Sequence, residues 1–192
     1  MQIVIQAVEQ RRRFVENIQS KLIGAIASYD NSGTPIGGFN KALQIPLDLE
    51  YRLHLQDDII LANGLYNYLP KLEEEMRKNN MKCLALYVPS QKKLNEAYNQ
   101  GKRYETTDRV WIQGIIFHKD IVDALRLDIK TTKEIKHDDV FVRSTLKRIK
   151  ENAYVHLPGL IQHNVWLGST VGHAKTTQRM STIFDINYIE KT

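Results

Sequence analysis

Short apolar runs rich in β-branched residues recur along the chain, and stretches with helical periodicity separate them. The first run, residues 2–8, has the length of a buried strand, and residues 11–22 then carry apolar side chains at helical spacing. Strands that alternate with helices in this way are typical of βαβ units and of a mostly parallel sheet. We therefore expect an α/β fold with a mostly parallel central sheet flanked by helices.

The other elements follow from the same patterns. A length of 192 residues, without an internal repeat or a clear boundary, favours one domain over residues 1–192. Residues 90–108 are polar and weakly periodic, which predicts a loop or a short helix of low order, and residues 157–173 are expected to form an ordered loop. Further strands are expected at 25–29, 51–55, 82–88, 110–117 and 154–156, and further helices at 39–43, 65–78, 119–125 and 140–150.

Composition limits the class of protein. A lone Cys83 excludes an internal disulfide framework and a cysteine-built zinc site. No apolar stretch approaches the roughly 20 residues that a membrane span needs, and Met1 is followed by no leader pattern, so we expect a cytoplasmic protein without a span. The net charge of +5 favours polyanionic partners such as nucleic acid or phosphate-bearing ligands, although an ordinary basic surface explains it equally well.

Carboxylates follow two of the expected strands. Asp30 comes after residues 25–29, and Asp57 and Asp58 come directly after residues 51–55. Because parallel sheets bind ligands outside the carboxyl ends of their strands, we expect these side chains to gather at one edge. Adjacent buried carboxylates need a positive partner, and Mg²⁺ or Mn²⁺ can supply it. The alternative is a solvated turn in which one carboxylate caps the next helix.

Histidines are concentrated in the last third of the chain. His163 ends an apolar run and can contribute a nitrogen to the same metal, or it can be a core histidine with satisfied hydrogen bonds. Ser169, Thr170 and His173 lie in a donor-rich segment that can bind a diphosphate.

A further acidic pair precedes the expected helix at 140–150. Asp138 and Asp139 offer a general base, although helix capping explains the same residues. Two groups of basic residues are also candidates for phosphate or nucleic-acid contacts, or are simply solvated faces. They are Arg11 to Arg13 near the first strand, and Arg143, Lys147, Arg148 and Lys150 at helical spacing.

The order of these segments resembles that of the GT-A-type nucleotide-sugar glycosyltransferases, and in particular of their small phage-encoded members. The opening strand ending in Gln6, Asp30 after the second strand, and the acidic motif at Asp57 and Asp58 are similar to the donor-binding motifs of that family. The segment 137–139 resembles its acidic catalytic segment, and residues 156–163 with 168–170 resemble its late strand and loop.

The resemblance implies a single GT-A-like domain with a donor-nucleotide half at about 1–88 and an acceptor or catalytic half at about 110–175. It implies Mn²⁺ or Mg²⁺ and a nucleotide-sugar donor of the UDP-sugar type. Gln56 departs from the acidic residue often found at its position, which lowers the negative charge of the site. The implied roles are Asp58 and His163 as metal ligands, Asp57 as a ribose or metal-water contact, Gln6, Arg11, Arg13 and Asp30 as nucleotide contacts, Ser169, Thr170 and His173 as diphosphate contacts, and Asp139, or alternatively Asp138, as the base.

The expected function is then transfer of a sugar from a nucleotide diphosphate to a hydroxyl group. Relatives of this type imply 5-hydroxymethylpyrimidine in phage DNA as the acceptor, and the host-cell cytoplasm as the location. A surface polysaccharide or a lipid-linked sugar is the alternative acceptor. A different class also fits the sequence: a non-catalytic nucleic-acid-binding protein that uses the basic helix with Trp111, Trp166 and Tyr154.

Overall fold

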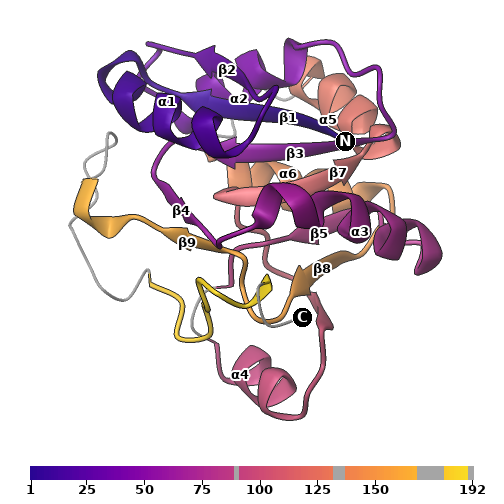
Figure 1. The fold of residues 1–192 in the computed structure, drawn as a ribbon. Coiled ribbons are helices and arrows are strands. Elements are labelled where there is room, and N and C mark those ends of the chain that lie inside the picture. The colour runs from indigo at the N-terminus through magenta and orange to yellow at the C-terminus, as the bar shows by residue number, and fades with distance from the viewer. Residues whose placement is uncertain (89–90, 132–136, 168–179, 190–192) are drawn as a thin grey trace.

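A seven-stranded sheet forms the centre of the computed structural model, which describes residues 1–88, 91–131, 137–167 and 180–189 (Figure 1). Its strand order is β2-β1-β3-β7-β5-β8-β6. Only β7 and β6 run antiparallel to their neighbours, so the predicted mostly parallel α/β sheet is confirmed. The strands are β1 (Gln2–Ala7), β2 (Ile26–Tyr29), β3 (Tyr51–Gln56), β5 (Cys83–Ala85), β6 (Tyr104–Thr107), β7 (Gly114–His118) and β8 (Ala153–His156).

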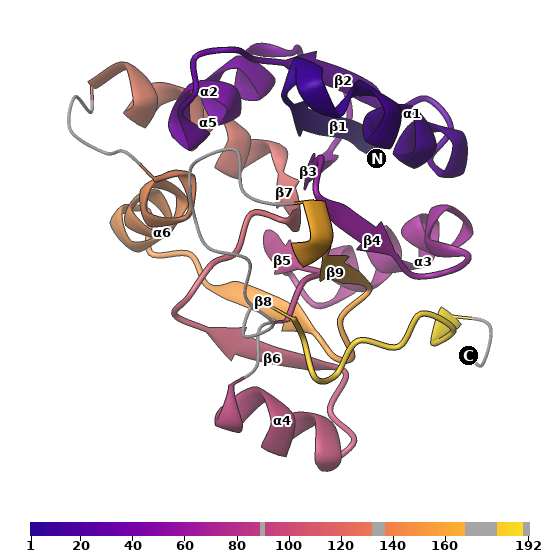
Figure 2. The same ribbon diagram turned by 90° about the vertical axis from the view of Figure 1, so that its left-hand side faces the viewer.

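Helices cover both faces of this sheet, and Figure 2 shows the two helical layers on opposite sides of the strands. Because side chains alternate along a strand, Ile116 of β7 joins the core beneath one pair of helices while Ile115 and Phe117 join the core on the other face. The pair consists of α1 (Arg12–Lys21) and α3 (Leu65–Lys78), and the opposite layer consists of α2 (Pro35–Gln44), α5 (Lys119–Thr131) and α6 (Asp138–Arg148).

The segment 90–108, predicted to be a loop or a short helix of low order, holds a short helix and also the edge strand of the sheet, which was not predicted. Its helix is α4 (Lys92–Asn99), and its strand is β6. Leu94 and Ala97 are buried against Val155 and Leu157, which form a third, small core cluster. These contacts place α4 at the end of the sheet (Figure 1).

A second sheet of two strands was not predicted. It pairs β4 (Ile59–Leu61) with β9 (Ile161–His163), and β9 lies in the segment expected to be a loop. A 3-10 turn, η2 (Val165–Leu167), follows it. Strands of three residues have too little length for an alternation pattern, so their pairing is decided by the packing of distant segments.

Several predicted boundaries are also wrong. The strand expected at 110–117 begins only at Gly114, and the strand expected at 82–88 narrows to β5. The helix expected at 39–43 starts earlier, because the Thr34 hydroxyl accepts a hydrogen bond from the Gly37 N–H and Pro35 occupies the first turn. The helix expected at 119–125 is longer than predicted, since α5 continues to Thr131.

The carboxyl ends of β1, β2 and β3 meet at one edge. Gln6 lies opposite Gln56, and Ala7 lies opposite Tyr29. Asp30 and the pair at 57–58 therefore follow strands that end side by side. None of the helices that the structure describes is long and apolar enough to cross a membrane.

Candidate functional site

A cavity of about 380 Å³ lies at this edge of the sheet. Its walls come from the ends of β1 and β3, the segment between β2 and α2, the residues before β7 and the start of α6. Open α/β sheets bind ligands at this place. The charged residues of its lining are the guanidinium of Arg11 and the five carboxylates of Asp30, Asp57, Asp58, Asp138 and Asp139.

Asp57 ties the end of β3 to the segment that follows β1. One carboxylate oxygen accepts the Val8 N–H at 2.8 Å, and the other accepts Nη1 of Arg11 at 2.7 Å. Burial raises the pKa of Asp57 even though these two donors act in the opposite direction. Arg11 is itself only 7% exposed, in η1 (Glu9–Arg11), so the basic run near the start of the chain has one member inside the protein.

Asp58 and His163 lie together although 104 positions separate them in the sequence. Pairing of Ile59 with His163 across β4 and β9 brings the Nε2 atom of His163 to 3.3 Å from Oδ2 of Asp58. Burial alone would raise the pKa of Asp58, but the His163 hydrogen bond and the Arg11 guanidinium, at 3.1 Å, hold this pKa below its usual value.

Asp58 and His163 are the residues that could hold a divalent ion of the Mg²⁺ or Mn²⁺ type. Oδ1 of Asp58 and Nδ1 of His163 are buried without a hydrogen-bond partner in the described part of the chain. Within that part, no group of three or more His, Cys, Asp or Glu side chains is placed to hold a metal. Two protein ligands suffice for such ions when substrate phosphates and water complete the coordination.

Asp138 is buried inside the cavity, whereas Asp139 lies at its exposed rim. Oδ2 of Asp138 accepts a hydrogen bond from Nε2 of Gln56 at 3.2 Å, and Oδ1 accepts the Asp139 N–H at 2.9 Å. Burial, with a contribution from the Asp139 charge, raises the pKa of Asp138 to about 6. Asp139 instead accepts the N–H of Val140 at the start of α6. The two candidates for a base therefore have different surroundings.

Gln6 is held in one orientation by a residue that the sequence analysis missed. The Nε2 atom of His54, in β3, lies 3.0 Å from Oε1 of Gln6, and the Gln6 amide donates to the carbonyl oxygen of Pro35. Burial lowers the pKa of His54 to about 3, so this imidazole is neutral and donates to Gln6. A histidine at an inward position of an apolar strand was the available signal.

The remaining predicted residues have separate outcomes. Asp30 lines the cavity and accepts hydrogen bonds from the backbone N–H and the hydroxyl of Ser32. Arg13 is exposed and does not line the cavity, because the turn of α1 that buries Val15 directs Arg13 to solvent. The position of Arg13 therefore does not support the predicted contact with a nucleotide. Ser169, Thr170 and His173 lie outside the described residues.

The sequence analysis also missed part of the lining. Trp111, Ile112 and Gln113 border the cavity because β7 begins after them, whereas a strand over 110–117 would have placed them within the sheet. Gly38, in α2, faces Gln6 so closely that an added Cβ would lie 3.0 Å from the Gln6 amide nitrogen. The missing side chain there keeps room for Gln6.

Comparisons with known proteins identify a fold but no family. No family model matches the chain, and no curated protein is significantly similar to it in sequence. A solved structure described as the crystal structure of A197 from STIV superposes with a TM-score of 0.51, at 12% sequence identity, over 84% of this chain and 84% of that chain. At this identity the likeness concerns the fold alone.

Proposed function

We propose that this protein is a metal-dependent glycosyltransferase that moves a sugar from a nucleotide diphosphate to a hydroxyl group on DNA. One observation carries the proposal: Asp58, whose Oδ2 lies 3.3 Å from Nε2 of His163, and the buried Asp138 line the same cavity, beside the carboxyl ends of β1 and β3. A pair suited to a cation and a carboxylate suited to proton transfer are the two parts that such a reaction needs.

The charge of the cavity decides what can bind there. Five carboxylates against one guanidinium repel a diphosphate unless a cation accompanies it. Asp58 and His163 would hold a divalent ion, which would supply this compensation and would stabilise negative charge on a leaving diphosphate. Arg11 forms ion pairs with Asp57 and Asp58, so its positive charge compensates these two carboxylates and not a bound diphosphate.

Asp138 is the proposed base. A carboxylate whose pKa is raised to about 6 is largely ionised at neutral pH, yet it is a stronger base than an ordinary aspartate. In a direct displacement, the acceptor oxygen forms a bond to the anomeric carbon as the bond from that carbon to the diphosphate breaks. The hydroxyl proton moves to Asp138, which Gln56 and the Asp139 N–H hold in place.

The proposed acceptor is 5-hydroxymethylpyrimidine in phage DNA, which would place the reaction in the host-cell cytoplasm. A net charge of +5 supports a polyanionic acceptor. A base inside a duplex cannot reach a cavity at a sheet edge, so it would be flipped out of the stack, as other enzymes that modify bases require.

The test is thermal unfolding with UDP and Mn²⁺, added separately and together. Linkage gives about 2.7 kcal/mol of stabilisation at a hundredfold excess over the dissociation constant, and we expect it only when both are present. Asp58→Asn should abolish this shift, whereas Asp48→Asn, at an exposed position away from the cavity, should retain it.

Four results would contradict the proposal. Stabilisation by UDP without metal, or an unchanged shift of the unfolding temperature in Asp58→Asn, would show that the proposed metal site is wrong. Stabilisation by DNA but never by a nucleotide with metal would favour a non-catalytic nucleic-acid-binding protein. Transfer to a polysaccharide or lipid-linked sugar, but not to modified DNA, in a screen of nucleotide sugars would replace the acceptor.

A further inference from the structure

A second, smaller cavity of about 200 Å³ adjoins the candidate site. Trp111 and Asp139 line both cavities, so the two meet where α6 begins. The remaining lining residues of the smaller cavity are Arg109, Val110, Val140 and Arg143.

The sign of the charge reverses between the two cavities. The larger one is dominated by carboxylates, whereas the smaller one has the guanidinium groups of Arg109 and Arg143 against the single carboxylate of Asp139. An anionic group is therefore attracted to the smaller cavity and repelled from the larger one in the absence of a cation.

Most other arginines in the described part of the chain form ion pairs or side-chain hydrogen bonds, and Arg109 and Arg143 do not. Arg148, on the same helix α6, lies 2.8 Å from Asp128, and Arg103 lies 2.8 Å from Glu75. No ion pair or side-chain hydrogen bond engages the guanidinium of Arg109 or Arg143 among the described residues, and both side chains are exposed. Their hydrogen-bond donors are thus available to a ligand.

The local backbone holds Trp111 and Arg109 in place. Val110 and Ile112, on either side of Trp111, are 5% and 1% exposed and pack into the core beneath α5 and α6. Trp111 itself stays partly exposed between them. The Thr107 hydroxyl, at the end of β6, accepts the Arg109 N–H and donates to the Arg109 carbonyl oxygen.

We infer that the smaller cavity binds a phosphodiester of a single-stranded or unstacked nucleic acid, with Arg109 and Arg143 on the phosphate and the Trp111 indole against a base. This inference rests on the proposed function, since it assigns the site that holds the acceptor strand. The planar fork of a guanidinium matches phosphate oxygens, and an indole stacks on any base. A lipid headgroup offers a phosphate but no flat ring for Trp111.

The position of the smaller cavity would bring the acceptor base close to Asp138. Because Trp111 and Asp139 belong to both cavities, a base stacked on the indole lies next to the cavity that contains Asp138. The strand is held by its phosphate outside the acidic pocket, and only the uncharged base enters it. This arrangement separates the negative acceptor backbone from the negative donor site.

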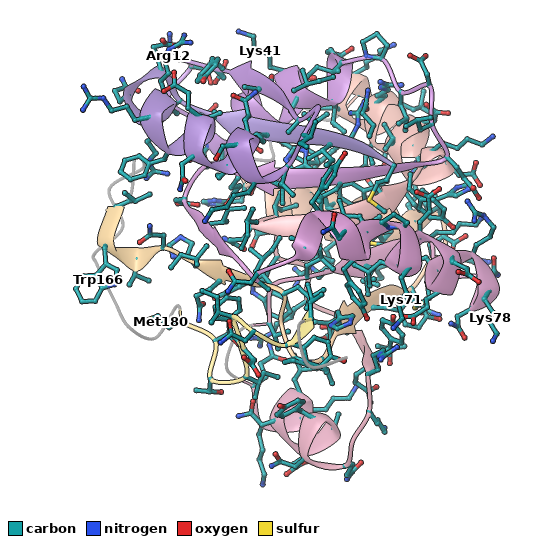
Figure 3. The ribbon with its side chains drawn as sticks, in the orientation of Figure 1. Arg12, Lys41, Lys71, Lys78, Trp166 and Met180 are labelled. Carbon is teal, nitrogen blue, oxygen red and sulfur yellow. The ribbon has the colours of Figure 1, made fainter. Side chains whose placement is uncertain are left out.

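The experiment uses tryptophan fluorescence in a Trp166→Phe background. The chain has two tryptophans, and Trp166, 73% exposed, points away from the body of the molecule (Figure 3), so Trp111 becomes the sole reporter. A short oligothymidylate, added without nucleotide or metal, should quench this fluorescence. Arg109→Ala and Arg143→Ala should each weaken binding by about tenfold and should each lower the salt slope of log Kd by about 0.7.

The matched control is Lys147→Ala, which removes one charge from α6 but lines neither cavity. It should bind as the parent does. Equal binding by all three variants, or binding that leaves Trp111 fluorescence unchanged, would overturn the inference. Binding of anionic lipid vesicles or heparin at Trp111 in preference to the oligonucleotide would overturn the assignment to nucleic acid.

The same variants separate this inference from the proposed function. Stabilisation by UDP with Mn²⁺ should be intact in Arg109→Ala and Arg143→Ala. If it is intact while the oligonucleotide fails to bind, only the acceptor site is wrong. If the oligonucleotide binds as expected but UDP with Mn²⁺ never stabilises the protein, the transferase is wrong and the nucleic-acid site stands.

Discussion

Asp138→Asn should make the protein more stable above pH 6, because a buried carboxylate opposes folding once it is ionised. The side chain is 6% exposed, and burial raises its pKa from 3.8 to about 6. Asparagine has nearly the same shape and can still accept the Asp139 N–H through Oδ1. The Gln56 amide can turn to present its oxygen to the new NH₂ group.

The magnitude follows from proton linkage. Between pH 4 and pH 6 the native protein keeps its proton on Asp138 while the unfolded chain has lost it, so stability falls as the pH rises through this range. A shift of about 2 pH units at 1.36 kcal/mol per unit corresponds to about 3 kcal/mol. The variant should therefore exceed the wild type by about 3 kcal/mol at pH 7 and match it below about pH 4.

Urea unfolding of both proteins at a series of pH values from 4 to 8 measures this difference directly. Asp48→Asn is the control, because an exposed carboxylate should change the unfolding free energy by less than about 0.5 kcal/mol at any pH. A variant that is no more stable than the wild type at pH 7, or a difference that does not vary with pH, would refute the reasoning.

Two further predictions concern activity and the buried arginine of β3. If Asp138 accepts the proton, kcat/KM should fall about tenfold per pH unit below a pKa of about 6, and a profile that stays flat down to pH 5 would exclude this role. Arg52, fully buried, donates to the carbonyl oxygens of Ala42 and Ile45 at the end of α2, so Arg52→Met should lower the unfolding free energy by roughly 1–3 kcal/mol. The control Lys41→Met, on the exposed side of α2 (Figure 3), should change it by less than about 0.5 kcal/mol, and equal effects of the two substitutions would contradict the capping role.

Local patterns were sufficient for the elements that carry many apolar residues. Strands β1 and β3 and helices α1 and α3 are each long enough, or apolar enough, to repeat a period several times. Their parallel order then predicts that Asp30, Asp57 and Asp58 gather at one edge, and the cavity lies there. Short elements such as β4, β9 and α4 gave no such signal.

Which of two neighbouring residues faces the cavity depended on the helical phase of the turn that carries them and on its packing. Asp138 and Asp139 are adjacent in the sequence, but the first turn of α6 buries one and exposes the other. The same applies to Arg11 and Arg13, of which only Arg11 lines the cavity. A pattern that places both members of a pair near a helix start does not say which one faces inwards.

The sequence by itself determined the class of fold and the edge at which polar groups collect, because hydrophobic periodicity and strand direction are local properties. The proximity of His163 to Asp58 agrees with the resemblance stated from the sequence, whereas the tertiary structure alone decided that His54 orients Gln6 and that Arg109 lies with Arg143 beside Trp111. These contacts join residues far apart in the chain, and their formation depends on strand register and on the burial of charge, which no local pattern encodes.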